Sequence, residues 1–394
     1  TGDFTAALMI SYADIATSIV VAVAYHNPHE PSLWNQSWLF KLTIGIMLLP
    51  IVVQTVLTYA TGQGWGATFV SMFGAKPLWD TYNASADRPL NRGSKMDPTT
   101  ALVLTRQSEV TFGSIPQAVL QSIAWVTLGS KAPWEAVLSL QGSVLAIAYL
   151  IASTDILYDS KPELMKLHST VLGYCPLDND GRLGMMVSET VFAGCYCAAK
   201  MIGLSVLGVG SHLALVGWLL GEILVLFLAK TTLEGTWRNS MHGMDGTLPS
   251  FFAFLTEYFS MLAAPLTIMR LPDFLGGGLY AACVTYSLFV NPLMIYVGLQ
   301  VDTDEQINIG LYRIWFAITS LTIGALLGAA SMWWWMVPSK RHTFYHHQSV
   351  KSYITMLWNE RTAGRVSARR GGGSFGSFAG SYQNEWSRML SDAD

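Results

Sequence analysis

Several ionisable side chains in this chain stand inside long apolar runs, where they could handle a polar or charged ligand. A charged group at the centre of a bilayer costs about 2.5–3.5 kcal/mol or more, so such residues usually face the interior of a helical bundle, paired or hydrated. The set comprises Asp14, Arg106, Glu109, Asp155, Glu189, Lys200, Glu222 and Glu257. Asp155 and Glu189 stand near the ends of their runs, where we expect them to reach toward water.

Two interpretations of this set are open. The residues could form ion pairs that lock helices together, for example Lys200 with Glu109 or with Asp155. Alternatively, they could line a polar path or cavity. Because acids outnumber bases in the set, the charges cannot all be paired, which favours a polar path for the set as a whole.

The stretch Arg106–Leu128 (RQSEVTFGSIPQAVLQSIAWVTL) concentrates this pattern. Its length and apolar content suit a membrane span, yet it begins with Arg106 and Glu109 and carries Pro116 and Gln117 further on. A proline inside a helix frees backbone carbonyls and commonly kinks the helix. Pro116 therefore marks either a kink needed for packing or a place where a headgroup or ion could touch exposed backbone.

The composition indicates an all-α polytopic membrane protein. Charged residues make up 12% of the chain, against about a quarter in soluble proteins, and apolar residues make up 51%. Many apolar runs reach about 20 residues, the length of a membrane-spanning helix. The net charge of −3 gives no indication of a nucleic-acid partner.

No motif indicates an enzyme, a cofactor or a metal. Signatures of phosphate-binding loops, nucleophilic hydrolases and zinc peptidases are missing from the sequence. His342, His346 and His347 have no cysteine or carboxylate at ligand spacing, so we interpret them as solvated. Four cysteines do not form a disulfide framework, and we expect inert buried thiols.

The apolar runs and the charge bias together predict eight spans and two re-entrant half-helices. Crossing all nine long runs would place the basic tail outside, against the positive-inside rule, whereas a re-entrant Phe251–Arg270 puts every strongly basic loop on one side. Both termini are then cytoplasmic, and Asp80–Thr105 is a polar loop. The expected spans are Phe4–Tyr25, Trp38–Ala60, Arg106–Leu128, Trp134–Tyr158, Met185–Gly210, Leu213–Lys230, Phe274–Val301 and Tyr312–Pro338.

The layout further predicts two related halves and a separate tail. One half-helix, Gly64–Trp79, follows span 2, and Phe251–Arg270 follows span 6, as in an internal structural repeat. The membrane domain covers residues 1–338 and the cytoplasmic tail residues 339–394. Within the tail, Ser349–Arg361 has an apolar helical face suited to a membrane interface, and the Gly/Ser-rich Arg369–Ser381 is expected to be flexible.

Three places in this sequence resemble the XK-related family of membrane proteins. Ser11–Ser18 (SYADIATS) is similar to the family's acidic first-helix motif, with Ser18 at the position of its second aspartate. Arg106, Glu109 and Pro116-Gln117 match its third helix, with Gly113 at a usually acidic position. Lys200 stands where the family has a basic residue.

The resemblance implies eight spans, two half-helices and passive phospholipid scrambling between leaflets. The headgroup would follow a polar track while the acyl tails stay in the bilayer. The residues of this track would be Asp14, Arg106, Glu109, Pro116, Gln117, Asp155, Lys200, Glu222 and Glu257. Two other functions stay open: a membrane scaffold or subunit that binds partners through its spans or tail, and an ion or small-solute transporter. The membrane is either the plasma membrane or that of an organelle.

Overall fold

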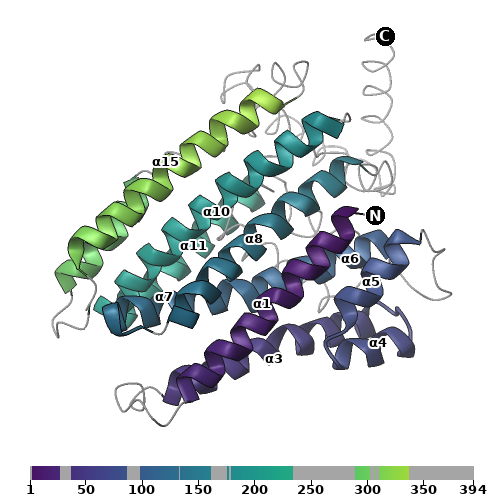
Figure 1. The fold of residues 1–394 in the computed structure, drawn as a ribbon, viewed down its shortest axis with the longest axis horizontal. Coiled ribbons are helices and arrows are strands. Elements are labelled where there is room, and N and C mark those ends of the chain that lie inside the picture. Colours follow the sequence, from purple (N-terminus) through teal and green to yellow (C-terminus); the bar gives the residue numbers. More distant parts are fainter. Residues whose placement is uncertain are drawn as a thin grey trace, which may run out of the picture. The chain divides into compact units, whose positions relative to one another are not determined.

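The computed structural model describes residues 2–26, 37–86, 98–132, 134–160, 175–176, 179–233, 289–301, 307 and 310–336. Every regular element within these ranges is a helix (Figure 1), which confirms the all-α expectation. The chain divides into two compact units, Thr1–Tyr345 and His346–Asp394. The expected Phe251–Arg270 half-helix, Glu257, the tail helix and the Gly/Ser-rich segment lie outside the described residues.

Five helices in the described ranges have the length and apolar composition to cross a membrane, as expected of a multi-pass membrane protein. They are α1 (Gly2–His26), α3 (Ser37–Ala60), α8 (Trp134–Ser160), α10 (Asn179–Gly210) and α15 (Leu311–Trp335). Two further apolar helices accompany them, α11 (His212–Leu233) and a shorter one, Phe289–Val301.

The predicted third span is part of a longer helical run with one irregular turn. The run consists of α6 (Pro98–Glu109), a π-helical turn η1 (Val110–Ser114) and α7 (Ile115–Leu128). Pro116 explains the irregular turn, because it has no amide hydrogen and its ring crowds the carbonyl four residues earlier. A single wide π turn accommodates such a disruption without ending the helix.

The prediction of a loop over Asp80–Thr105 is wrong at both ends of that range, where the structure has helices. The half-helix predicted over Gly64–Trp79 is instead two short helices. Helix α4 (Trp65–Met72) and helix α5 (Lys76–Ser85) form a hairpin that extends past Asp80. Gly74 makes the tight turn between them with a φ of 69°, a value that side-chain-bearing residues rarely adopt. Polar composition misled the prediction, because both α5 and the first turns of α6 bury polar side chains against other helices.

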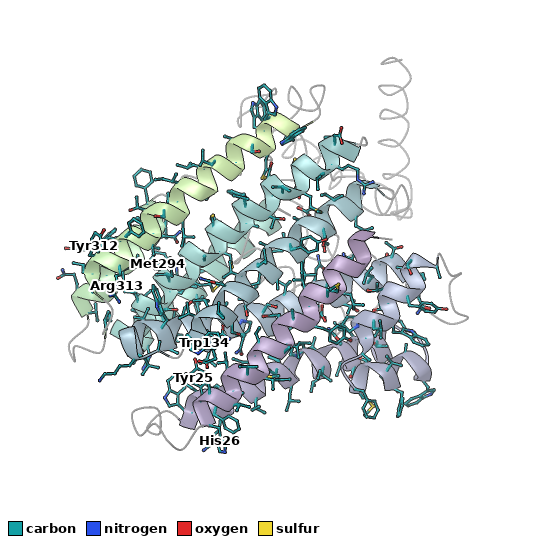
Figure 2. All side chains as sticks on the ribbon, viewed as in Figure 1. Tyr25, His26, Trp134, Met294, Tyr312 and Arg313 are labelled. Carbon is teal, nitrogen blue, oxygen red and sulfur yellow. The ribbon has the colours of Figure 1, made fainter. Side chains whose placement is uncertain are left out.

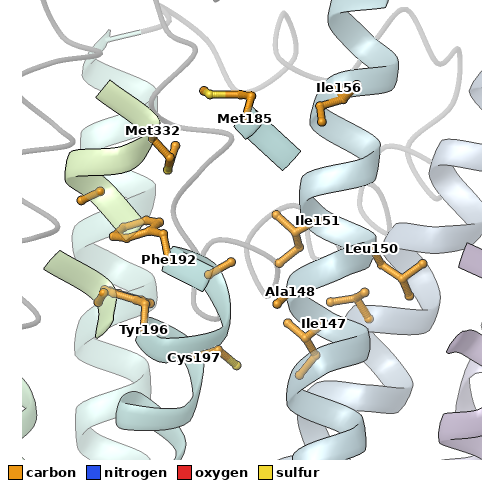
Figure 3. Close-up of a cluster of buried hydrophobic side chains, with 14 of the residues drawn as sticks. Ile147, Ala148, Leu150, Ile151, Ile156, Met185, Phe192, Tyr196, Cys197 and Met332 are labelled. Atoms are coloured by element: carbon orange, nitrogen blue, oxygen red, sulfur yellow. The ribbon is translucent and has the colours of Figure 1, made fainter. Parts of the chain in front are cut away.

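Helix α10 lies at the centre of the bundle. Its residues Met185, Phe192 and Tyr196 pack with Ile147 and Ile151 of α8 in an apolar cluster that also receives side chains from α15 (Figure 3). A second cluster joins α10 to α7 and to the Phe289–Val301 helix. A helix buried by neighbours on most sides can fix their relative positions through packing alone.

Small residues bring α15 against α10 in antiparallel order. A Cβ on Gly328 would lie 2.6 Å from the amide nitrogen of Phe192, and one on Gly324 would lie 2.5 Å from Sγ of Cys195. Beyond them, the hydroxyls of Ser188 and Ser331 are 2.7 Å apart. Such closeness maximises van der Waals contact, which drives helix association in lipid where the hydrophobic effect between helices is weak.

Helices that follow one another along the chain alternate in direction, whereas α1 and the η1–α7 run contact each other in parallel order. The contacts of α1 and α7 with α8, of α3 with α6 and η1, and of α11 with α10 all run in antiparallel order. In Figure 2, Tyr25 at the end of α1, Trp134 at the start of α8 and Tyr312 at the start of α15 lie toward the same end of the bundle. Tyrosine and tryptophan favour membrane interfaces, so this end suits one headgroup region.

The packing of α10 against α15 predicts a matched pair of glycine variants. We expect Gly328→Ala to destabilise the protein by about 1–3 kcal/mol, because the new methyl group meets backbone atoms that cannot move aside. Gly45→Ala is the control, since its Cβ would meet nothing within 4 Å, and we expect no loss. Thermal unfolding in detergent measures both, and equal unfolding temperatures would contradict the packing argument.

Candidate functional site

A buried carboxylate joins three helices at the centre of the candidate site. Asp14 of α1 accepts hydrogen bonds from Ser114 Oγ in the π turn at 2.7 Å and from Ser143 Oγ of α8 at 2.6 Å. Its side chain is only 9% exposed. Each carboxylate oxygen therefore has a hydroxyl donor, which offsets part of the cost of removing the charge from water.

Polar contacts continue from Asp14 in both directions along α1. Toward its start, Ser11 Oγ donates to Glu109 Oε1 at 3.1 Å. Toward its end, Ser139 Oγ donates to Thr17 Oγ1 at 3.4 Å and accepts from Gln121 Nε2 at 2.7 Å. We call this row the α1 seam, and its residues are Ser11, Asp14, Thr17, Glu109, Ser114, Gln121, Ser139 and Ser143.

Helical spacing explains why the residues of the seam lie in a row. On α1, Ser11, Asp14 and Ser18 recur every three or four residues and so share one buried face. On α8, Ser139 and Ser143 are four residues apart and likewise share a face. Asp14 and Glu109 were predicted from the sequence but the serines were not, although the S-x-x-D-x-x-x-S spacing on α1 is a signal for such a face.

Arg106, Pro116 and Gln117 lie on the same helical run as Glu109 and Ser114. Arg106 is buried, and its Nη1 donates to Ser153 Oγ of α8 at 3.3 Å. Pro116 is partly exposed just after the π turn. Gln117 is buried, and neither atom of its amide has a hydrogen-bond partner in the part of the chain that the structure describes.

Asp155 and Glu189 are buried, contrary to the expectation that they reach water at span ends. Their exposed fractions are 2% and 0%. The reason is that both helices extend past the predicted spans: α8 runs to Ser160 and α10 begins at Asn179. Both carboxylates therefore lie more than a turn inside their helices, where neighbouring helices cover them.

Lys200 pairs with Glu222 rather than with Glu109 or Asp155. Its Nζ lies 2.6 Å from Glu222 Oε1 of α11 and 5.9 Å from the centre of the Tyr196 ring. The described contacts thus place Asp14 and Glu109 in the α1 seam and the Lys200–Glu222 pair between α10 and α11. The described residues of the predicted site therefore do not all gather in one place, and the Lys200–Glu222 pair connects two helices.

Gly113 has a steric reason to be glycine. A Cβ there would lie 3.0 Å from Cγ of Pro50 on α3. A longer side chain in that position would have to displace the proline or push α3 away from the π turn. The acid that the family resemblance implies at this position would therefore point at α3.

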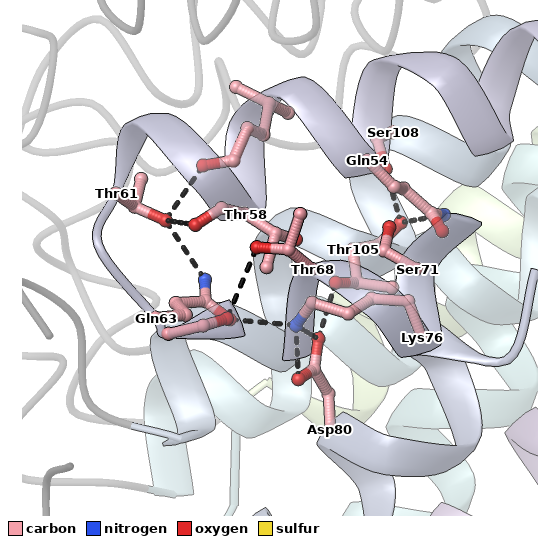
Figure 4. Close-up of polar contacts among 12 residues, drawn as sticks. Gln54, Thr58, Thr61, Gln63, Thr68, Ser71, Lys76, Asp80, Thr105 and Ser108 are labelled. Carbon is pink, nitrogen blue, oxygen red and sulfur yellow. Dashed lines mark hydrogen bonds and ion pairs between the residues drawn. The ribbon is translucent and has the colours of Figure 1, made fainter. Parts of the chain in front are cut away.

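A second polar cluster, absent from the sequence predictions, ties the α4–α5 hairpin to α6 (Figure 4). Lys76 Nζ forms an ion pair with Asp80 one turn later and donates to Gln63 Oε1 at 2.8 Å. Asp80 Oδ2 also accepts from Thr105 Oγ1 at 2.6 Å, and Gln54 Nε2 of α3 contacts the Thr105 carbonyl at 3.5 Å. Thr105 is the residue before Arg106, so this cluster fixes the start of the run that carries Arg106 and Glu109.

The ion pair of this cluster is almost fully removed from solvent. Burial raises the pKa of the Asp80 carboxyl and lowers the pKa of the Lys76 ammonium, while the charge of each partner acts in the opposite direction. Loss of either partner would leave a buried charge without compensation.

The seam offers hydroxyls, carboxylates and amides but no metal-binding group of side chains. Among the residues that the structure describes, no three His, Cys, Asp or Glu side chains gather closely enough to hold a metal ion. A scan against models of known protein families gives no match, and neither does a search of curated proteins. The chemistry that the α1 seam offers is the exchange of hydrogen bonds and charge contacts with a polar group.

The Lys76–Asp80 pair predicts a rescue experiment. We expect Lys76→Met to destabilise the protein by about 3–5 kcal/mol, because Asp80 keeps a buried charge without its partner. Adding Asp80→Leu should recover most of this loss, since an apolar pair of similar volume replaces a buried ion pair at little cost. Lys41→Met, at an exposed lysine, is the control. Chemical unfolding measures all four proteins, and a double variant no more stable than the single one would contradict this account.

Proposed function

We propose that this protein moves phospholipids passively between the leaflets of a membrane, with their headgroups passing along the α1 seam. The observation that carries the proposal is the row of hydrogen-bonded groups along α1, with Ser11 and Glu109 on one side of Asp14 and Ser139 and Gln121 on the other. A zwitterionic or charged headgroup in hydrocarbon costs many kcal/mol, and fixed polar partners lower that barrier without ATP.

The position of the seam supports passage beside lipid rather than through a central pore. Helix α1 covers the seam with its polar face, while Tyr12, Ile15 and Ile19 on its other face are exposed. Only about a quarter of the α1 span is buried, against more than three quarters of the α10 span. A headgroup could enter where α1 separates from α8, because part of the contact between them consists of single hydrogen bonds that a headgroup can replace.

The proposed topology is eight crossings with two half-helix elements and both termini in the cytoplasm. Its support is the alternating direction of the described helices together with the basic loops after spans 2, 4 and 6. In this arrangement the α4–α5 hairpin is the first half-helix element. It follows α3 directly and exposes Trp65, Phe69 and Phe73, side chains suited to a lipid interface.

A second candidate is a membrane scaffold without transport activity. The observation that favours it is that Asp14 and Lys200 both hold neighbouring helices together in the described structure. In that role the polar residues stabilise the bundle, and partner membrane subunits or a tail-binding protein would supply the activity. Unchanged behaviour of Asp14→Asn and Glu109→Gln, with stable co-purification of a partner, would favour this alternative.

The proposed function predicts different effects of two serine variants. The full chain is reconstituted into liposomes that contain a fluorescent lipid, and an impermeant quencher reports how fast the label reaches the outer leaflet. We expect at least a tenfold acceleration by the wild type. Ser143→Ala should lower the rate roughly fivefold, because the headgroup loses one partner worth about 1 kcal/mol.

Ser188→Ala is the control for this experiment. Ser188 is also a buried serine with a hydroxyl partner, Ser331, but it lies between α10 and α15. We expect it to leave the rate unchanged. No acceleration by the wild-type protein, or equal losses in the two variants, would rule out a headgroup route along the seam.

A further inference from the structure

The helices that form the α1 seam carry acidic residues and almost no compensating base. No lysine or arginine occurs at residues 1–40, 107–130 or 132–160, which together contain α1, η1, α7 and α8. The same helices contain Asp14 and Asp155, with Asp3 and Glu135 near helix ends. Segments in which acidic residues outnumber basic ones create a negative potential, which is strong in a low-dielectric interior.

Arg106 is the basic side chain closest in sequence to the seam, and its hydrogen bond places it toward one end. Its Nη1 donates to Ser153, ten residues beyond Ser143 along α8. Ten residues of α-helix span about 15 Å. The guanidinium is therefore held away from the Asp14 contacts with Ser143, and it lies on the Glu109 side of the seam.

Asp14 keeps acceptor capacity after its two hydrogen bonds. A carboxylate can accept about four hydrogen bonds, and Ser114 and Ser143 supply two. The carboxylate is therefore able to receive two further donors or to contact a cation directly.

An independent observation at the other end of the seam also indicates a ligand. Gln121 is 0% exposed and donates to Ser139, yet its carbonyl oxygen has no partner among the described residues. One turn earlier on α7, both polar atoms of the buried Gln117 amide lack a partner among the described residues. Buried acceptors without donors are costly and rare, and a bound donor or cation would satisfy them.

We propose that the α1 seam binds a small cationic group, either the ammonium of a lipid headgroup or a free ammonium or alkali cation. The ethanolamine headgroup fits best, because its three N–H groups match carboxylate and amide oxygens. Choline is attracted by charge alone, and headgroups with a net negative charge are repelled. The lipid form of this inference rests on the proposed function, whereas cation binding does not.

The first arm of the test measures lipid preference in liposomes that contain the full chain. Lipids labelled on the acyl chain keep the headgroup native, and phosphatidylethanolamine, phosphatidylcholine and phosphatidylglycerol are compared. We expect the first two to cross at least tenfold faster than phosphatidylglycerol. Asp14→Asn should abolish this ratio, Asp14→Glu should retain it, and Ser188→Ala should leave it unchanged. Equal rates for all three lipids in the wild type would overturn the headgroup form.

The second arm measures binding without transport, in detergent. The unfolding temperature of wild type and Asp14→Asn is followed with ethanolammonium chloride and sodium chloride, against N-methylglucamine chloride at equal ionic strength. A higher unfolding temperature in either small cation, seen for the wild type but not for Asp14→Asn, supports the site. A rise with sodium shows that the site takes a free cation and does not need a lipid headgroup. If the protein speeds the crossing of none of the three lipids, the proposed function is wrong, and this arm still tests whether the seam binds a cation. No difference among the three salts would overturn cation binding.

Discussion

A carboxylate inside a helical bundle must receive hydrogen bonds from its neighbours, and much of this structure follows from how Asp14 obtains them. Its two donors come from different helical segments, Ser114 in the π turn and Ser143 on α8. Both bonds form only if α1 has one rotation about its axis and one position along it. The serines and the threonine of the α1 seam lie beside one another because they share the helical faces that these bonds bring together.

The two sides of the bundle are held together by different physical means. Between α10 and α15, glycines allow backbones to touch, and any separation would lose many van der Waals contacts at once. Between α1 and α8, small hydroxyls exchange single hydrogen bonds, each of which water or a polar ligand can replace. The two interfaces therefore differ in how much of their contact a polar group can replace.

Composition and apolar length were sufficient to predict a helical membrane protein, because the bilayer imposes both. Asp14 and Glu109 were found for the same reason, since acids inside apolar runs need a special environment. The partners of Lys200 were not predictable, because ion pairing depends on which helices become neighbours. The Lys76–Asp80–Thr105 cluster was missed because a polar segment is expected to be solvated, and only the packing of α5 against α6 buries it. Gly113 stands at a position that the family resemblance gives as acidic, and only the structure shows that a Cβ there would lie 3.0 Å from Cγ of Pro50.

The π turn has a further consequence for how this chain tolerates changes in length. Each residue advances an α-helix by about 100°, and the wide turn at Val110–Ser114 absorbs one extra residue. Deleting a residue there would restore a regular helix while rotating everything before it relative to everything after it. Thr105 would then leave Asp80, or Ser114 would leave Asp14. The extra residue thus acts as an adapter between two independently fixed polar clusters, so insertions and deletions within this turn should be tolerated far less than at either end of the helix.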